Sequence, residues 1–252
     1  MSPLILAIET SQQSCGVALR DSSGLHNRQQ MAAKQHASLL LPMIKELLID
    51  RELSLQDLNA ISFSCGPGSF TGARIAASVT QGLAYAANAK AIPVSSLLAL
   101  AHTYAQQHPA SENIPLFVLM DAHMGEYYAA CYQFDSEQGL TDTLLKDCLL
   151  SDQQLIDELG RCETAILLGN GIKVLFEKPD ALLPASLTKR LQVVAEPERA
   201  IQAKASSVLA IAETAWQSGN TAAPEQALPV YLRERTAWKT VKQQNAPKSE
   251  SQ

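Results

Sequence analysis

The chain has 252 residues with a formal net charge of −5, and 46% of them are apolar while 18% are charged. This composition excludes a disordered chain, and its acidic balance gives no support for a protein that binds nucleic acid on its own. Because the apolar stretches are too short to span a bilayer and the N-terminus lacks the features of a signal peptide, we expect no membrane association. Five scattered cysteines without a CxxC pair indicate reduced thiols, so we expect a cytoplasmic protein.

Taken in chain order, the first hundred residues predict three strands followed by alternating helices and strands. The strands are expected at 4–10, 15–20, 25–31, 60–65 and 91–95, and the helices at 35–50, 69–88 and 97–107. This α/β order implies a mixed sheet with helices packed on it.

A second, looser copy of this order begins at Pro115. The strands are expected at 116–121, 126–134, 143–149 and 164–168, and the helices at 151–160 and 206–218. Ser151 and Gln154 have the spacing of a capping box at the start of the first of these helices.

We therefore expect two lobes. The N-terminal lobe covers residues 1–105 and is completed by the helix at about 206–220, and the C-terminal lobe covers residues 106–205. Residues 239–252 are polar and contain lysines and a proline, which predicts a flexible tail.

A glycine-rich loop separates the buried strand 60–65 from the long helix that follows it. Three of the twelve glycines fall in this loop, Gly66-Pro67-Gly68-Ser69-Phe70-Thr71-Gly72. Glycine permits positive φ and close approach of other atoms, and the free N–H groups at a helix start attract anions. The loop is neither a Walker A nor a GxGxxG motif. A tight turn and a vestigial phosphate loop are equally good interpretations, and the candidate cofactor-binding residues are Gly66, Gly68, Ser69, Thr71 and Gly72.

The segment 64–75, SCGPGSFTGARI, closely resembles the GPGSFTGLRIG signature of the TsaB (YeaZ) family. Four other segments match that family in order: LAIETS at 6–11, HASLLLP at 36–42, MDAHMGEYY at 120–128 and PVYLR at 229–233. The resemblance covers nearly the whole chain. It implies an α/β protein with the actin/Hsp70-like ATPase (ASKHA) fold, in which two lobes each contain a mixed sheet and flanking helices.

The resemblance also implies a function. TsaB is a non-catalytic subunit in the formation of N6-threonylcarbamoyladenosine, at the adenosine 3′ of the anticodon in tRNAs that read ANN codons. It binds and supports the threonylcarbamoyltransferase TsaD through helices of the N-terminal lobe, and the bacterial complex also includes the ATPase TsaE. The resemblance further implies that the free subunit is able to form a homodimer, and that tRNA is contacted only through the complex.

Two positions depart from the family pattern. Glu9 stands where the actin-like fold usually has Asp, and His123 stands where the family often has Arg. The paralogue TsaD binds its catalytic metal through two histidines four residues apart on the first helix, whereas here His36 is followed at that spacing by Leu40. We therefore expect no catalytic residue, no metal site and no cofactor beyond weak binding of ATP or ADP.

An active enzyme is the rival interpretation, because actin-like lobes host many chemistries. A kinase or another nucleotide-dependent transferase would use the loop 66–72 and Gly169-Asn170-Gly171 across a cleft between the lobes. The Glu9 departure and the missing second histidine argue against it.

Two helices contain more apolar residues than packing on one sheet requires. Apolar residues cover well over half of the helix 35–50, whereas a single buried stripe needs about 100°. The helix 69–88 is rich in alanine, which lets another helix approach closely. Burial within this chain is one explanation, but we favour a two-helix surface that pairs with another subunit, as the resemblance also implies. The candidate interface residues are Leu40, Ile44, Leu47, Ala76, Val79 and Leu83.

Overall fold

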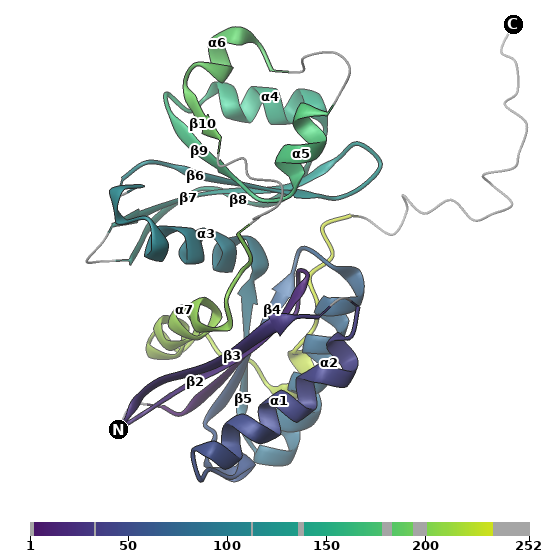
Figure 1. The fold of residues 1–252 in the computed structure, drawn as a ribbon, viewed down its shortest axis with the longest axis vertical. Coiled ribbons are helices and arrows are strands. Elements are labelled where there is room, and N and C mark those ends of the chain that lie inside the picture. Colours follow the sequence, from purple (N-terminus) through teal and green to yellow (C-terminus); the bar gives the residue numbers. More distant parts are fainter. Residues whose placement is uncertain are drawn as a thin grey trace, which may run out of the picture.

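Two five-stranded sheets, one in each half of the chain, form the frame of the computed structural model (Figure 1). The structure describes residues 3–32, 34–111, 113–135, 139–177, 183–193 and 201–233. The predicted tail, residues 239–252, lies outside the described residues.

The first sheet has the strand order β3-β2-β1-β4-β5. Its strands are β1 (Ile5–Glu9), β2 (Ser14–Asp21), β3 (Gly24–Met31), β4 (Ala60–Gly66) and β5 (Lys90–Ser95). The central strand β1 pairs antiparallel with β2 and parallel with β4, so that Ile8 lies between Val17 and Phe63. Both faces of β1 are buried, which explains its continuous run of apolar residues.

The second sheet repeats this arrangement with the order β10-β9-β6-β7-β8. Its strands are β6 (Leu116–Asp121), β7 (Tyr127–Asp135), β8 (Gly139–Leu150), β9 (Ala165–Leu168) and β10 (Leu191–Val193). In each sheet three antiparallel strands are followed by two parallel ones. This duplication confirms the predicted α/β, actin/Hsp70-like class.

Helices cover both sheets in layers (Figure 1). They are α1 (His36–Asp50), α2 (Phe70–Ala87), α3 (Ser96–Gln107), α4 (Asp152–Gly160), α5 (Gly171–Phe176), α6 (Ala185–Thr188) and α7 (Ala205–Gln217). Helices α1 and α2 pack on one face of the first sheet, and α7 returns from late in the chain to pack on the other. Helix α3 lies between the two lobes, and α4 and α5 cover the outer face of the second sheet.

Short 3₁₀ turns and side-chain caps complete the connections. The turns are η1 (Leu55–Asp57), η2 (Pro109–Ser111) and η4 (Pro224–Gln226). The capping box predicted at Ser151 and Gln154 is confirmed, and Ser69 and Ser95 cap α2 and α3 by accepting a backbone N–H. Within the described part of the chain, no helix is both long and apolar enough to cross a membrane.

Candidate functional site

The glycine loop packs against the turn that follows β1. A Cβ atom on Gly68 would lie 2.7 Å from the carbonyl oxygen of Ser11, and a Cβ atom on Gly72 would overlap the carbonyl oxygen of Thr10. Gly68 also has φ +152°, a conformation that other residues rarely adopt. Glycine is therefore required here because one part of the chain approaches another closely.

Polar groups of the loop bind the same turn. The Ser69 N–H donates to the Ser11 carbonyl at 2.8 Å, and the Thr10 hydroxyl donates to the Gly72 carbonyl at 2.8 Å. The Gly72 N–H donates to the Ser69 hydroxyl at 3.1 Å. These contacts explain the loop as a tight strand-to-helix turn, and nucleotide binding by its five candidate residues stays a prediction. Thr71, another of them, is exposed on the first turn of α2.

Glu9 lies directly beneath this loop and is fully buried. Its carboxylate accepts hydrogen bonds from the N–H and the hydroxyl of Ser11, each at 2.6 Å, and from the hydroxyl of Ser64. Burial raises the pKa of Glu9, while the three hydrogen bonds oppose that rise. Glu9 is thus held inside the first lobe by two serines.

A segment near the end of the chain, residues 227–233, runs from one lobe to the other; we call it the strap. At its midpoint, the Val230 N–H donates to the Cys65 carbonyl at 2.8 Å, next to Gly66. The next residue, Tyr231, accepts through its hydroxyl from Nε of Arg74 at 2.7 Å, and Arg74 stacks on the ring of Phe70. Figure 1 shows this yellow segment rising beside α2 toward the second lobe.

Arg233 joins the strap to the second lobe. Its side chain is 13% exposed and forms an ion pair with Glu126 at 2.6 Å. It also donates to the carbonyl oxygens of Ala122 and His123, at 2.9 and 3.3 Å, in the turn between β6 and β7. The strap therefore connects the glycine loop to the β6–β7 turn.

The glycines at 169–171 serve the same packing role in the second lobe. A Cβ atom on Gly169 would overlap the carbonyl oxygen of Leu119 on β6. The Asn170 side chain accepts from the Asp121 N–H at 3.1 Å, and Asp121 accepts from the His123 N–H at 2.7 Å. Asp121 thus caps the turn after β6.

One polar cluster between the lobes was not found by sequence reasoning. Asp147 on β8 accepts a hydrogen bond from Ser95 at 2.6 Å and from the Tyr132 hydroxyl at 2.5 Å. Burial raises the pKa of Asp147, and the two hydrogen bonds oppose that rise. Ser95 also caps α3, so the cluster fixes the start of that helix to the second sheet. A single Asp in a predicted strand gives no signal of such a role.

The candidate interface residues need correction. Leu40, Ile44, Leu47 and Ala76 are buried in this chain's own core, beneath α1 and α2, and are not available to a partner. Val79 and Leu83 are partly buried against the same core. Part of the surplus of apolar residues is buried because α1 contacts the sheet and α2 at once, which widens its buried arc.

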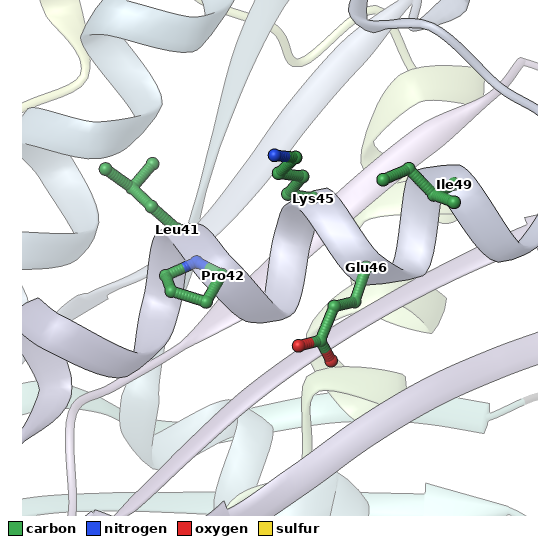
Figure 2. A pocket seen from close by; sticks show the side chains of 5 residues that line it. All are labelled: Leu41, Pro42, Lys45, Glu46 and Ile49. Carbon is green, nitrogen blue, oxygen red and sulfur yellow. The ribbon is translucent and has the colours of Figure 1, made fainter.

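The outer face of α1 contains a different set of apolar residues. Leu41 and Ile49 are 50% and 61% exposed, and they lie on one stripe with Lys45. With Pro42 and Glu46 these residues line a shallow hollow on the helix (Figure 2). On α2 the exposed positions include Ser78, Gly82 and Ala86, four residues apart.

Comparison with known proteins gives matches that cover most of the chain. The family model "TsaD: tRNA N6-adenosine threonylcarbamoyltransferase" matches residues 25–239. The chain is 34% identical over 242 residues to the tRNA threonylcarbamoyladenosine biosynthesis protein TsaB of Escherichia coli, covering 93% of this chain and 96% of the relative. It is 30% identical over 243 residues to the protein of the same description from Haemophilus influenzae, covering 93% and 95%. The solved structure of YeaZ from Pseudomonas aeruginosa superposes with a TM-score of 0.75 at 30% identity, covering 91% of this chain and all of that one.

Proposed function

Because the chain belongs to the TsaB family, we propose that it is a non-catalytic subunit in the formation of N6-threonylcarbamoyladenosine in tRNA. In this role it binds and supports the transferase TsaD, joins TsaE in the same complex, and contacts tRNA only as part of that complex. The cytoplasm, where tRNA is modified, is the compartment that this role requires.

The observation that carries the proposal is the exposed apolar stripe on α1. Leu41 and Ile49 are eight residues apart and lie on one side of the helix, while its opposite side fills the core. Fully burying an exposed aliphatic side chain contributes about 1.5–3 kcal/mol. Leu41 and Ile49 are each about half exposed, so covering both favours association by part of the sum for two side chains. On this proposal, a helix of TsaD packs against the stripe.

Helix α2 supports the same docking surface, because it lies on the same face of the first sheet (Figure 1). Its exposed small residues Ser78, Gly82 and Ala86 recur every fourth position, and a Cβ atom on Gly82 would meet nothing within 4 Å. A partner helix is therefore able to approach the α2 backbone closely. We name Leu41, Ile49, Ser78, Gly82 and Ala86 the docking surface.

The test is complex formation with TsaD from the same organism, measured by size-exclusion chromatography with light scattering. We expect the wild-type chain to form a heteromeric peak at micromolar concentration, and we expect the double variant Leu41→Glu, Ile49→Glu to lose it. The matched control is Leu144→Glu, which changes a 48% exposed leucine on β8 of the other lobe and should leave the peak unchanged. If the double variant is folded and still co-elutes, the docking surface is wrong; if the wild-type chain does not co-elute, the partner is wrong.

The packing of the glycine loop supports the non-catalytic role over the rival enzyme. Carbonyl oxygens of Thr10 and Ser11 lie against Gly72 and Gly68, and Glu9 binds serines of its own lobe. On the proposal, ATP or ADP binds at most weakly and is not turned over. The measurement is phosphate release from ATP by the isolated chain, where turnover that is lost in Glu9→Gln would restore the kinase or transferase interpretation.

A further inference from the structure

Four planar side chains lie exposed where the strap passes from one lobe to the other (Figure 1). Phe70 begins α2 and is 54% exposed, and Tyr231 in the strap is 53% exposed. Arg74 is exposed one turn after Phe70, and the side chain of His123 in the β6–β7 turn is 85% exposed. We call these four residues the ring patch.

The first three groups of the ring patch are fixed to one another. The guanidinium carbon of Arg74 lies 3.4 Å from the ring centroid of Phe70 and 5.5 Å from that of Tyr231. The two ring centroids are 5.9 Å apart, and Nε of Arg74 donates to the Tyr231 hydroxyl at 2.7 Å. The rings are therefore held in place although about half of each side chain is exposed.

The strap brings the fourth group beside them. Arg233, two residues after Tyr231, donates to the carbonyl oxygens of Ala122 and His123 and lies 3.0 Å from the sulfur of Met124. Two residues of chain span at most about 7 Å, so the β6–β7 turn lies close to the rings. His123 and Met124 have φ of +61° and +58°, a conformation that residues other than glycine seldom adopt. The contacts of Arg233 hold this turn in place.

Packing within the chain does not account for the ring patch. Phe70 and Tyr231 belong to none of the three apolar clusters formed by the described residues. Among the described residues no carboxylate forms an ion pair with Arg74. Asp121 faces His123 at 3.2 Å, so Arg74 gives the patch its unbalanced positive charge. Exposed rings beside a free cation indicate an interaction surface.

The chemistry of the ring patch favours RNA over protein. Unpaired RNA bases stack on Phe, Tyr and His rings and on the plane of an Arg guanidinium, and phosphate attracts a free cation. Protein interfaces also use Tyr and Arg. Here, however, all four side chains are planar, and the charge complements a polyanion.

We propose that the ring patch binds unpaired bases of the tRNA that the complex modifies. This inference rests on the proposed function, which brings a single-stranded anticodon loop to the complex. Because the chain has a net charge of −5, the patch does not hold RNA alone, and further cations come from the partner subunit.

The test uses the complex of this chain with TsaD and a fluorescently labelled, unmodified transcript of a tRNA that reads an ANN codon. Binding is measured by fluorescence anisotropy. The double variant Phe70→Ala, Tyr231→Ala removes both rings, and we expect the Kd to rise at least about tenfold because base stacking is lost. The double variant Phe70→Tyr, Tyr231→Phe keeps both rings and should bind like the wild type. The matched control is Phe176→Ala on α5, which removes a 51% exposed ring elsewhere and should not change the Kd.

The charge of the ring patch has its own measurement. Arg74→Gln removes one cation while leaving the rings in place. We expect the slope of log K against log salt concentration to become shallower by about 0.7, the value for one phosphate contact with a single strand. An unchanged slope would contradict contact between Arg74 and phosphate.

Light scattering of each complex separates failure of the ring patch from failure of the proposed function. If the wild-type chain forms no complex with TsaD, both are overturned. If the complex forms and binds tRNA equally tightly with and without the two rings, the ring patch alone is overturned. If Phe70→Ala, Tyr231→Ala loses TsaD itself while circular dichroism shows a folded chain, the patch is a protein interface and the RNA assignment is wrong.

Discussion

At some backbone positions in this protein only glycine fits, because the carbonyl oxygen of a residue far along the chain lies against that position. Gly72 and Thr10 are 62 positions apart, yet the Thr10 carbonyl occupies the space of a Cβ atom at position 72. We expect Gly72→Ala to lower the free energy of unfolding by about 3 kcal/mol or more, because the turn after β1 must shift. Urea denaturation monitored by circular dichroism measures this loss.

A second glycine of α2 is the control for the first. Gly82 lies mid-helix with open space around it, so Gly82→Ala should raise the free energy of unfolding by about 0.5–1 kcal/mol. Opposite shifts of the two urea midpoints are expected. Equal shifts would contradict the close approach at Gly72.

The pH dependence of stability reports on Glu9. Because burial raises its folded pKa above the ordinary value of 4.5, the folded state binds the proton more tightly than the unfolded state. The contribution of Glu9 is therefore fully present below about pH 4.5 and is lost as the pH rises through the folded pKa. We expect the difference in free energy of unfolding, wild type minus Glu9→Gln, to fall as the pH rises above about 4.5. The exposed Glu177→Gln serves as control, and a flat difference for Glu9→Gln would contradict the raised pKa.

At this scale the sequence predicts where special residues lie but not what they touch. The three glycines of the loop were singled out by their spacing, and the turn interpretation explains them. Their contacts with Thr10 and Ser11 join positions that no local pattern relates. Asp147 gives no signal for the same reason.

The positions of the helices along the chain were predicted more accurately than the side of each helix that is buried. The helices expected at 35–50 and 69–88 correspond to α1 and α2 within about a residue at each end. Their composition predicted a second covering surface, but it did not show that one side of α1 is buried against α2 and the sheet while the other side is exposed. Consequently Leu40 and Ile44 are core residues, and the neighbouring Leu41 is exposed.

The shortest elements could not be predicted. Helices α5 and α6 have six and four residues, and β10 has three, so none is long enough for a hydrophobic period to be visible. The strand β8 begins at Gly139, earlier than expected, because its first half is exposed and lacks the apolar residues that mark a strand.

A side chain introduced at position 82 should weaken docking without disturbing the fold. Gln favours helix, so Gly82→Gln should leave the fold intact or stabilise it, while its side chain keeps a partner helix away from α2. We expect the Kd for TsaD to rise at least about tenfold, or about 1.4 kcal/mol, by isothermal titration calorimetry. The control is Thr214→Gln on the exposed face of α7, which should not change the Kd. An unchanged Kd for Gly82→Gln would remove α2 from the docking surface.

At the scale of the molecule, the strap and the Ser95–Asp147 contact join the two lobes. Arg233→Ala removes an ion pair with Glu126 and two hydrogen bonds to carbonyl oxygens at a site that is largely shielded from water. We expect a loss of about 1–2 kcal/mol in the free energy of unfolding, measured with urea. Arg161→Ala, which breaks a pair on the surface with Glu158, should cost about 0.5 kcal/mol or less. Similar losses of unfolding free energy in the two variants would show that the Arg233 contacts of the strap contribute little to the stability of the protein.

The architecture of two lobes followed from the order of the predicted elements, and the repeated sheet confirms it. The path of the strap did not follow from that order, because residues 229–233 resemble a family motif without any periodic pattern. Val230 contacts β4 and Arg233 contacts the β6–β7 turn, and only the folded chain brings these two places together.

The return of α7 to the first sheet has a consequence for how the protein is made. The ribosome releases the chain from its N-terminus, so β1–β5 emerge first, but the face that α7 covers stays open until residues 205–217 have been synthesised. The second sheet, in contrast, is contiguous from β6 to β10 and has all its strands before α7 emerges. The lobe that is translated first is therefore the lobe that is completed last, and nascent chains stalled before residue 205 expose apolar surface to chaperones.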